Sequence, residues 1–331
     1  LASASTDCGA CGHDCGGGAC TLGACQPVAV NVQTAGVASF GVGPTEIYFS
    51  TPESAAGGPP KLFACPKDGC TLAPRQLASM AFYIGSIVYA AGAVVFESAP
   101  TQSTTRPNIY ACPEAGCAGP PVSLASDGLN GFVEPLFAVG PRVFYNGGGI
   151  GLGSTTCAAG ACADGASLGV KGLRAVSADA TRLAYVDTTE NGKQLATCDY
   201  TAGTCVSTPL VPGDQSAVPA TQIYNNNLYF LSPGRESYSE GKLRVCSLAD
   251  NCTTITNLSN GLDSPSSLLV DASGSYWFSK AIPTLQHCAP DTCTGGAKNL
   301  AGPLVAPGSL TADDKFVYWL SEGVVWRVAK P

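Results

Sequence analysis

The sequence is poor in charged residues, and those it has are spread along the chain. Only 12% of its 331 residues are Asp, Glu, Lys or Arg, the 17 Lys and Arg residues form no cluster, and the net charge is -7. Neutralising the phosphates of a nucleic acid requires a basic surface. We therefore expect no nucleic-acid partner.

Long apolar runs and helical periodicity are also missing. No uninterrupted apolar stretch approaches the roughly 18 residues of a transmembrane helix, so we expect no membrane span. No segment keeps the i, i+3, i+4, i+7 spacing of a surface helix over three turns. Instead, 40 Gly and 24 Pro favour turns, and a hydrophobic content of 45% is enough for a sizeable core. The composition indicates an all-β protein.

Histidine is nearly absent, with only His13 and His287 in the chain. A structural zinc site needs four converging nitrogen or sulfur ligands, and serine hydrolase chemistry needs a base beside the nucleophile. His287 directly precedes Cys288, on the side of the molecule expected to carry the cysteine pairs, and no nucleophile elbow is found. We therefore expect no metal and no cofactor. A metal knot around His13 is the alternative within the thiol-rich N-terminal segment.

Cysteine, by contrast, is abundant, and most of it comes in short pairs. Six pairs have first members 41 to 48 residues apart: Cys65 and Cys70, Cys112 and Cys117, Cys157 and Cys162, Cys198 and Cys205, Cys246 and Cys252, and Cys288 and Cys293. Two cysteines that face each other across a tight hairpin have the separation a disulfide requires. The pairs therefore predict disulfides that act as structural staples, and a secreted or cell-surface location.

Residues 1–25 form a segment with its own cysteine pattern, containing Cys8, Cys11, Cys15, Cys20 and Cys25. Cys20 and Cys25 share the four-residue gap found in four of the six blade pairs, so we predict that they bond to each other. Three cysteines then remain, one of them free or bonded to a residue removed upstream. The start "LASASTDCGACG" lacks the basic and apolar parts of a signal peptide, so we expect a processed or trimmed form.

The spacing of the pairs is the length of one four-stranded propeller blade. A short aromatic strand precedes each pair, and a seventh follows the last: 46–50, 93–98, 142–146, 182–187, 227–231, 275–279 and 316–320. Each blade therefore reads as a strand, a tight turn, an aromatic strand, a variable loop, a strand ending in the first cysteine, a turn and a last strand.

The two chain ends complement each other. The end "GVVWRVAKP" matches the third strand "NIYACPEA", with Val328 in the place of Cys112, and then lacks a fourth strand. Residues 25–34 read as that strand. We therefore predict an all-β, seven-bladed β-propeller of four-stranded antiparallel blades, closed by the N-terminal strand. Its domains are a cysteine-rich segment, 1–25, and a propeller, 26–331. Six blades and a separate terminal piece are the alternative.

Two stretches also resemble known families. The run "CGACGHDCGGGACTLGACQP" (8–27) resembles the cysteine-rich leader of secreted myxobacterial proteins, and the aromatic strands "VYW" and "YWF" resemble those of YWTD and NHL-like propellers. The resemblance implies a secreted propeller. No strand carries Tyr-Trp-Thr-Asp intact, so receptor-type ligands do not carry over.

Loop length indicates where function lies. The loops between second and third strands are long and irregular (50–61, 97–108, 146–156 and 232–242), and they share one face with the connections between blades. The candidate ligand-binding residues on this face are Tyr83, Arg106, Phe132, Glu134, Arg235 and Tyr238. Asp179, Asp271 and Asp313 recur at the tight turns of the opposite face, where Asp is favoured for local hydrogen bonds.

The sequence favours one class of function and leaves two others open. The favoured class is a binding module for a glycan, a peptide or a surface protein. The second is an extracellular glycosidase or lyase using Glu97, Glu134 and Asp187 near the channel mouth. The third is a scaffold that only assembles.

Overall fold

The computed structural model is built from β-strands and turns. It describes residues 4–6, 8, 14–22, 24–30, 36–52, 58–70, 73–99, 108–125, 136–146, 151–170, 173–187, 194–211, 218–232, 240–280, 283–289, 293 and 296–331. Within these ranges, no helix has the length and apolar character needed to cross a membrane.

The chain forms two compact units, Asn31–Pro209 and Leu1–Val30 with Leu210–Pro331. The first unit holds four antiparallel sheets, and the last strand of the fourth runs on to Val211. Blade 1 is β4 (Ser39–Val42), β5 (Glu46–Thr51), β6 (Lys61–Pro66) and β7 (Arg75–Ser79). Blade 2 is β8 (Tyr83–Ala90), β9 (Ala93–Ala99), β10 (Asn108–Pro113) and β11 (Val122–Ala125). Blade 3 is β12 (Phe137–Val139), β13 (Arg142–Asn146) and β14 (Leu152–Ala158), with a last strand split into β15 (Ala161–Cys162) and β16 (Ala166–Ser167). Blade 4 is β17 (Leu173–Ala178), β18 (Arg182–Asp187), β19 (Gln194–Asp199) and β20 (Thr208–Val211).

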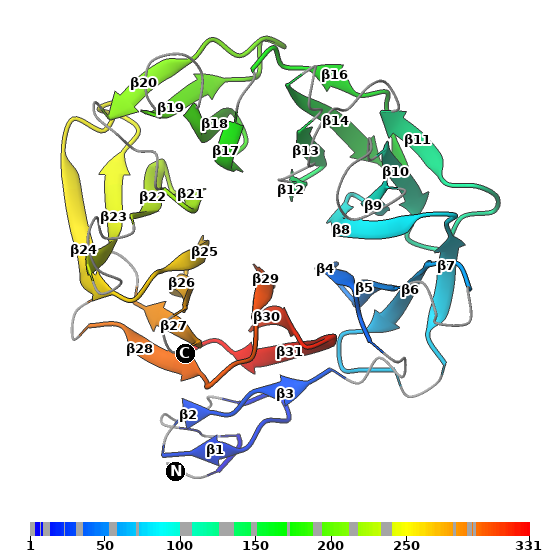
Figure 1. The fold of residues 1–331 in the computed structure, drawn as a ribbon, viewed down its shortest axis with the longest axis horizontal. Helices are drawn as coiled ribbons and strands as arrows, with labels where there is room; N and C mark the ends of the chain where they lie inside the picture. Colours follow the sequence, from blue (N-terminus) through cyan, green and yellow to red (C-terminus); the bar gives the residue numbers. More distant parts are fainter. Residues whose placement is uncertain are drawn as a thin grey trace. The chain divides into compact units, whose positions relative to one another are not determined.

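The second unit holds three such sheets and a small hairpin (Figure 1). Blade 5 is β21 (Thr221–Tyr224), β22 (Asn227–Ser232), β23 (Gly241–Ser247) and β24 (Ile255–Leu262). Blade 6 is β25 (Ser266–Asp271), β26 (Gly274–Ser279), β27 (Thr284–Cys288) and β28 (Lys298–Ala301). Blade 7 is β29 (Gly308–Ala312), β30 (Phe316–Ser321), β31 (Val324–Ala329) and the N-terminal β3 (Val28–Ala29). The hairpin is β1 (Cys20–Thr21) with β2 (Ala24–Cys25).

The second strand of each blade supplies much of the core. Tyr276, Trp277 and Phe278 of β26 are all buried, on both faces of the sheet. An apolar strand of this kind, without polar alternation, is typical of a sheet covered on both sides. Within a unit the cover comes from neighbouring blades, since Tyr276 packs in one cluster with Trp319 of blade 7. The prediction that the aromatic strands lie between blades is therefore confirmed.

The predicted chain closure is also confirmed. Val28 and Ala29 of β3 pair with Arg327 and Trp326 of β31. The N-terminal strand thus becomes the fourth strand of the C-terminal blade and covers an edge that would otherwise offer unpaired backbone groups. Seven four-stranded antiparallel blades result, so the alternative of six blades is wrong.

Recurring hydrogen bonds define one end of most blades. The backbone N–H just after the third strand donates to a carbonyl in the turn between the first two strands. Examples are Lys67 to Thr45 (3.2 Å), Glu114 to Gly92 (2.8 Å) and Tyr200 to Thr181 (3.1 Å). The cysteine hairpins lie at this end, which we call the hairpin end. The opposite end carries the connections between blades, and we call it the connection end.

All six predicted blade pairs are disulfides in the structure. Some of their hairpins also contact the preceding blade. The Cys117 N–H of blade 2 donates to the Leu77 carbonyl of blade 1 at 3.1 Å, and the Cys205 N–H of blade 4 donates to the Leu168 carbonyl of blade 3 at 3.0 Å. These hairpins therefore join blades as well as bracing them internally.

The predicted bond between Cys20 and Cys25 is wrong. The two residues do face each other in the β1–β2 hairpin, but Cys20 bonds to Cys8 and Cys25 bonds to Cys15. The physical reason is burial: Cys8 and Cys15 pack into the core cluster shared by the hairpin and blades 6 and 7. Cys11 lies outside the described residues.

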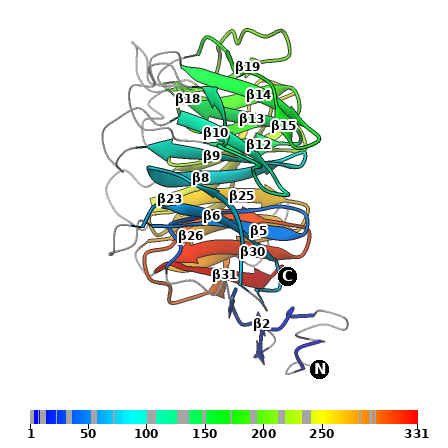
Figure 2. The ribbon, with the colours of Figure 1, turned by 90° about the vertical axis from the view of Figure 1, so that its right-hand side faces the viewer.

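The N-terminal segment is fixed on blade 7, beside β31 (Figures 1 and 2). The Arg327 guanidinium lies 4.6 Å from the centre of the Phe316 ring and donates to the Gly16 carbonyl at 3.0 Å. Gly16 has φ +58°, and a Cβ at this position would overlap the Phe316 ring. A glycine is therefore required where this segment crosses the blade.

Candidate functional site

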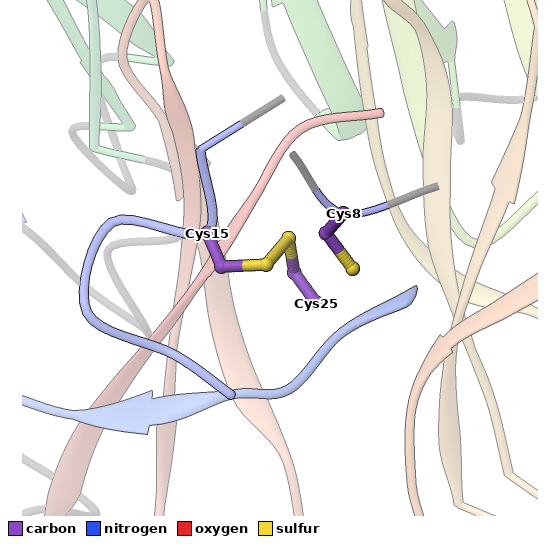
Figure 3. A group of neighbouring side chains, drawn as sticks. All are labelled: Cys8, Cys15 and Cys25. Carbon is purple, nitrogen blue, oxygen red and sulfur yellow. A yellow bond between two sulfur atoms is a disulfide. The ribbon is translucent and has the colours of Figure 1, made fainter. Parts of the chain in front are cut away.

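Three cysteine sulfur atoms lie close enough together to suggest a metal site, but all three belong to disulfides. The sulfur atoms of Cys8, Cys15 and Cys25 lie within 4.8 Å of one another, and Figure 3 shows the Cys15–Cys25 bond beside the Cys8 sulfur. Cys8 is bonded to Cys20. Metals bind the thiolate form of cysteine, and a disulfide sulfur is not a thiolate. This group is therefore a structural knot. His13, the alternative ligand, lies outside the described residues.

The recurring Asp residues at the hairpin end serve the local backbone, as predicted. The Asp179 carboxylate accepts the N–H groups of Thr181 (2.8 Å) and Arg182 (2.7 Å), and the Asp313 carboxylate accepts those of Lys315 and Phe316, both at 2.8 Å. Each carboxylate thereby holds its tight turn.

A buried lysine joins blades 6 and 7 at the same end. Lys330 Nζ donates to Asp271 Oδ2 and to the Asp313 carbonyl, and the Lys330 side chain is only 9% exposed. Burial alone would raise the pKa of Asp271, but hydrogen bonds from Lys330 and Ser273 lower it below its ordinary value. Lys330 and Asp271 thus form an ion pair that joins blade 7 to blade 6, and we call this structural contact the Lys330 clasp.

His287 is also built into blade 6. It is buried, its ring centre lies 4.9 Å from that of Tyr276, and its Nε2 lies 3.1 Å from the Ser273 carbonyl oxygen. Burial lowers the pKa of His287. Its packing accounts for the residue without a catalytic role.

The connection end repeats a different hydrogen bond. At the end of the second strand a serine hydroxyl donates to a carbonyl 16 residues earlier, in the connection entering the same blade. The bonds are Ser98 Oγ to Phe82 O (3.4 Å), Ser279 Oγ to Asp263 O (3.1 Å) and Ser321 Oγ to Val305 O (2.5 Å). We call Phe82, Asp263 and Val305 the latched residues.

The latched residues share a local frame. Each lies four residues before a serine in the first strand of its blade, and that strand has a register shift in all three blades. The shifts occur between Ile84 and Ile87, between Ser266 and Leu268, and between Gly308 and Leu310. Connections with the same frame and different side chains present variable groups on a constant backbone.

The three latched side chains differ in chemistry. Phe82 is 45% exposed and Val305 is 53% exposed, although both are large and apolar. Asp263 is partly buried, and its carboxylate makes no hydrogen bond or ion pair with any described residue. Phe82 and Val305 therefore expose apolar surface that is available for contact with another molecule.

A groove of about 460 Å³ lies beside the first latched connection. Its lining residues are Ser79, Met80, Ala81, Tyr110, Gly119, Pro120 and Pro121. Met80 and Ala81 directly precede Phe82, so the groove and the exposed Phe82 ring adjoin one another along the chain. The aromatic, proline and methionine side chains give the groove a largely apolar wall, suited to an apolar group.

Of the six predicted ligand-binding residues, the structure describes Tyr83 alone. Arg106, Phe132, Glu134, Arg235 and Tyr238 lie outside the described residues. Tyr83 follows Phe82 at the start of β8 and pairs with Ala99 of β9. Residues two apart on a strand share a face, so Tyr83 lies on the same face of blade 2 as Glu97.

The two described acids of the enzyme hypothesis lie in different blades. Glu97 is in β9 of blade 2, where a Cβ on Gly85 would lie 3.2 Å from its Oε2 atom. Asp187 ends β18 of blade 4, in the strand position that Ser98 occupies in blade 2.

The sequence analysis missed the latched residues. Their signal was present as a fixed spacing: Phe82, Asp263 and Val305 each precede one serine by four residues and a second by 16. The hydrogen bond that explains this spacing can be seen only in the three-dimensional structure.

Comparison with known proteins supports the fold class. The sequence matches no protein-family model and no curated protein. Among solved structures, virginiamycin B lyase from Staphylococcus aureus has a TM-score of 0.63 at 13% identity, over 92% of this chain and 98% of the lyase. YCF48 bound to a D1 peptide has a TM-score of 0.61 at 12% identity, over 92% and 97%. The WD40 β-propeller domain of Doa1 has a TM-score of 0.58 at 10% identity, over 91% and 95%.

These similarities and the seven sheets define the class: the chain is a seven-bladed β-propeller. Identities of 10–13% carry the fold and no activity. Any function must therefore be argued from the residues of this chain.

Proposed function

We propose that this propeller is an extracellular recognition module that binds polypeptide segments through its connection end. One observation carries the proposal: three connections have the same serine-to-carbonyl hydrogen bond, while their side chains are Phe82, Asp263 and Val305. A fixed backbone with variable, accessible side chains is the usual arrangement of a binding surface on a rigid scaffold.

The apolar character of this surface favours a polypeptide over a glycan. Phe82 and Val305 are exposed, and the groove beside Phe82 is walled by Met80, Tyr110 and two prolines. Peptides supply apolar side chains for such contacts, whereas glycans present mainly hydroxyl groups. YCF48, whose fold is similar, was solved with a D1 peptide, which supports a peptide among the expected ligands.

The extracellular location rests on the cysteines. Sixteen of them form eight disulfides, and such a number persists in oxidising compartments. We extend the proposed surface to Tyr83 and to the loop residues predicted with it: Arg106, Phe132, Glu134, Arg235 and Tyr238. Residues 1–25 remain, in this proposal, an accessory segment of the propeller domain 26–331.

A displayed library of random linear peptides tests the proposal. Peptides enriched on the protein are synthesised, and their affinities are measured for the native chain, Phe82→Ala and Val206→Ala. Val206 is also exposed, at 78%, but it follows a cysteine hairpin. We expect Phe82→Ala to weaken at least one class of enriched peptides about tenfold, because a buried aromatic contact is lost. Val206→Ala should leave the affinities unchanged.

A glycan array probed in parallel decides the alternative ligand class. Binding to glycans without enrichment of any peptide would show that the ligand is a carbohydrate. Enriched peptides that respond equally to Phe82→Ala and Val206→Ala would place the binding surface elsewhere. Release of a shortened glycan would instead support the enzyme hypothesis.

A further inference from the structure

The latched positions of blades 6 and 7 carry an acid and an aliphatic side chain, in neighbouring sheets of one unit. Asp263 enters blade 6, and Val305 enters blade 7. From this pair we propose that the preferred ligand is a polypeptide with a basic side chain near an apolar one, the basic group bound by Asp263. This inference rests on the proposed function and names its ligand class.

The Asp263 carboxylate lacks a partner among the described residues, although its backbone is fixed. The Asp263 carbonyl accepts from Ser279 Oγ at 3.1 Å and from the Lys280 N–H at 3.2 Å, so the residue is held in one place. Its side chain is partly buried and is not paired with any basic residue that the structure describes. A partly desolvated carboxylate without a counter-ion favours a cationic ligand group.

The carboxylates in the turns of the hairpin end differ in this respect. Asp271 is paired with Lys330, and Asp179 and Asp313 accept hydrogen bonds from their own turns. Those three act within the fold. The Asp263 carboxylate accepts no hydrogen bond from described residues of its own turn, and it occupies the position at which blades 2 and 7 present Phe82 and Val305, so its charge is available to a ligand.

The blade spacing sets the spacing of the two ligand groups. Sheets packed face to face are about 10 Å apart, and an extended chain advances about 3.3 Å per residue. Asp263 and Val305 occupy equivalent positions in adjacent blades, and alternate side chains of an extended chain face the same way, so an extended ligand would meet them with side chains two or four residues apart. We therefore expect a Lys or Arg two or four residues from a Leu, Ile or Val.

A double-mutant cycle on the enriched peptides tests the pairing. Each peptide is synthesised with its basic residue intact or changed to Gln, and is titrated against the native chain, Asp263→Asn and Asp250→Asn. Asn keeps the shape of Asp, and the fold of each variant is checked by circular dichroism. Asp250→Asn removes the same charge from an exposed position in the hairpin turn of blade 5.

We expect Asp263→Asn and the peptide's Gln change each to weaken binding about fivefold, with no further loss in combination. Asp250→Asn should change affinity less than twofold. The inference is overturned if enriched peptides lack basic residues, or if Asp263→Asn and Asp250→Asn have equal effects. Either result, with Phe82→Ala still weakening the peptides, would leave the proposed function standing and remove only the ligand class.

Discussion

At the scale of residues, similar side chains serve opposite ends of the blades in different ways. The carboxylates of Asp313 and Asp271 are held by hydrogen bonds at the hairpin end, whereas the Asp263 carboxylate at the connection end makes none with described residues. Residue type alone does not distinguish these roles, but the number of hydrogen-bond partners around each carboxylate does. A carboxylate with partners in the chain stabilises the fold, whereas a carboxylate without partners is available for binding.

The Asp271–Lys330 pair gives a prediction for acid stability. Since the pKa of Asp271 is lowered in the folded protein, its contribution is present above the unfolded pKa, near pH 4, and is lost as the pH falls through the folded value. We expect Asp271→Asn to lower the free energy of unfolding by about 1 kcal/mol at pH 7. The difference from the native chain should shrink below about pH 4, as measured by urea unfolding.

Other charged groups lie near this ion pair, so the experiment needs a control variant. Asp313 also lies against Lys330, through its carbonyl, and Lys298 and His287 lie in the same blade as Asp271. Asp250→Asn, an exposed change, should show no pH-dependent difference from the native chain. A difference between Asp271→Asn and the native chain that stays constant from pH 7 to acid would contradict the role of this ion pair.

At the scale of elements, the cysteine hairpins act on two sheets. The hairpin closed by Cys112 and Cys117 braces blade 2, and its Cys117 N–H bonds to Leu77 in β7 of blade 1. The hairpin of Cys246 and Cys252 differs, because the Cys252 N–H bonds to Ser247 in its own blade. The two hairpins therefore form a matched pair for measuring the contact between blades.

Replacing both cysteines of a hairpin by serine should cost about 2 kcal/mol, the entropy of closing a loop of about six residues. We expect this loss for both hairpins by chemical denaturation. Only Cys112→Ser with Cys117→Ser should also speed amide exchange in β7, since that strand loses its contact with blade 2. Equal exchange in β7 for the two double variants would show that the hairpins act within single blades.

The elements also show how far the sequence could predict the structure. The seven aromatic strands, the six blade disulfides and the pairing of β3 with β31 follow from repeat length and residue pattern, because each repeat contacts mainly its neighbours. The predicted bond between Cys20 and Cys25 is wrong although the two residues do face each other, which is all that their spacing indicates. The spacing does not indicate that the buried Cys8 and Cys15 bond to them instead.

The candidate site was less predictable for a similar reason. Tyr83 was chosen from a loop pattern, while its neighbour Phe82 is the residue with both an exposed side chain and a latched carbonyl. Exposure and hydrogen bonding depend on how the connection folds against the second strand. Sequence spacing alone could have identified the repeated position, but not the bond at that position.

At the scale of the whole molecule, the blades divide their work between two ends. The hairpin end is closed by disulfides, aspartate turns and the Lys330 clasp, all of which satisfy groups of the chain itself. At three described connections the backbone is fixed by a serine hydroxyl, and the Phe82 and Val305 side chains are exposed. If the connection end binds ligands, as we propose, stability and recognition fall to opposite ends of the same strands, and the ligand-facing residues can change without loss of the fold.

The central claim is that ligands bind at the connection ends of the blades, and hydrogen–deuterium exchange with the enriched peptides tests it most directly. The account predicts slower amide exchange in residues 80–86 with peptides that Phe82→Ala weakens, and in residues 261–267 and 302–309 with peptides that Asp263→Asn weakens. Exchange in the hairpins at 66–70 and 113–117 should not change. Protection of the cysteine hairpins, with exchange at the three connections unaltered, would contradict the account.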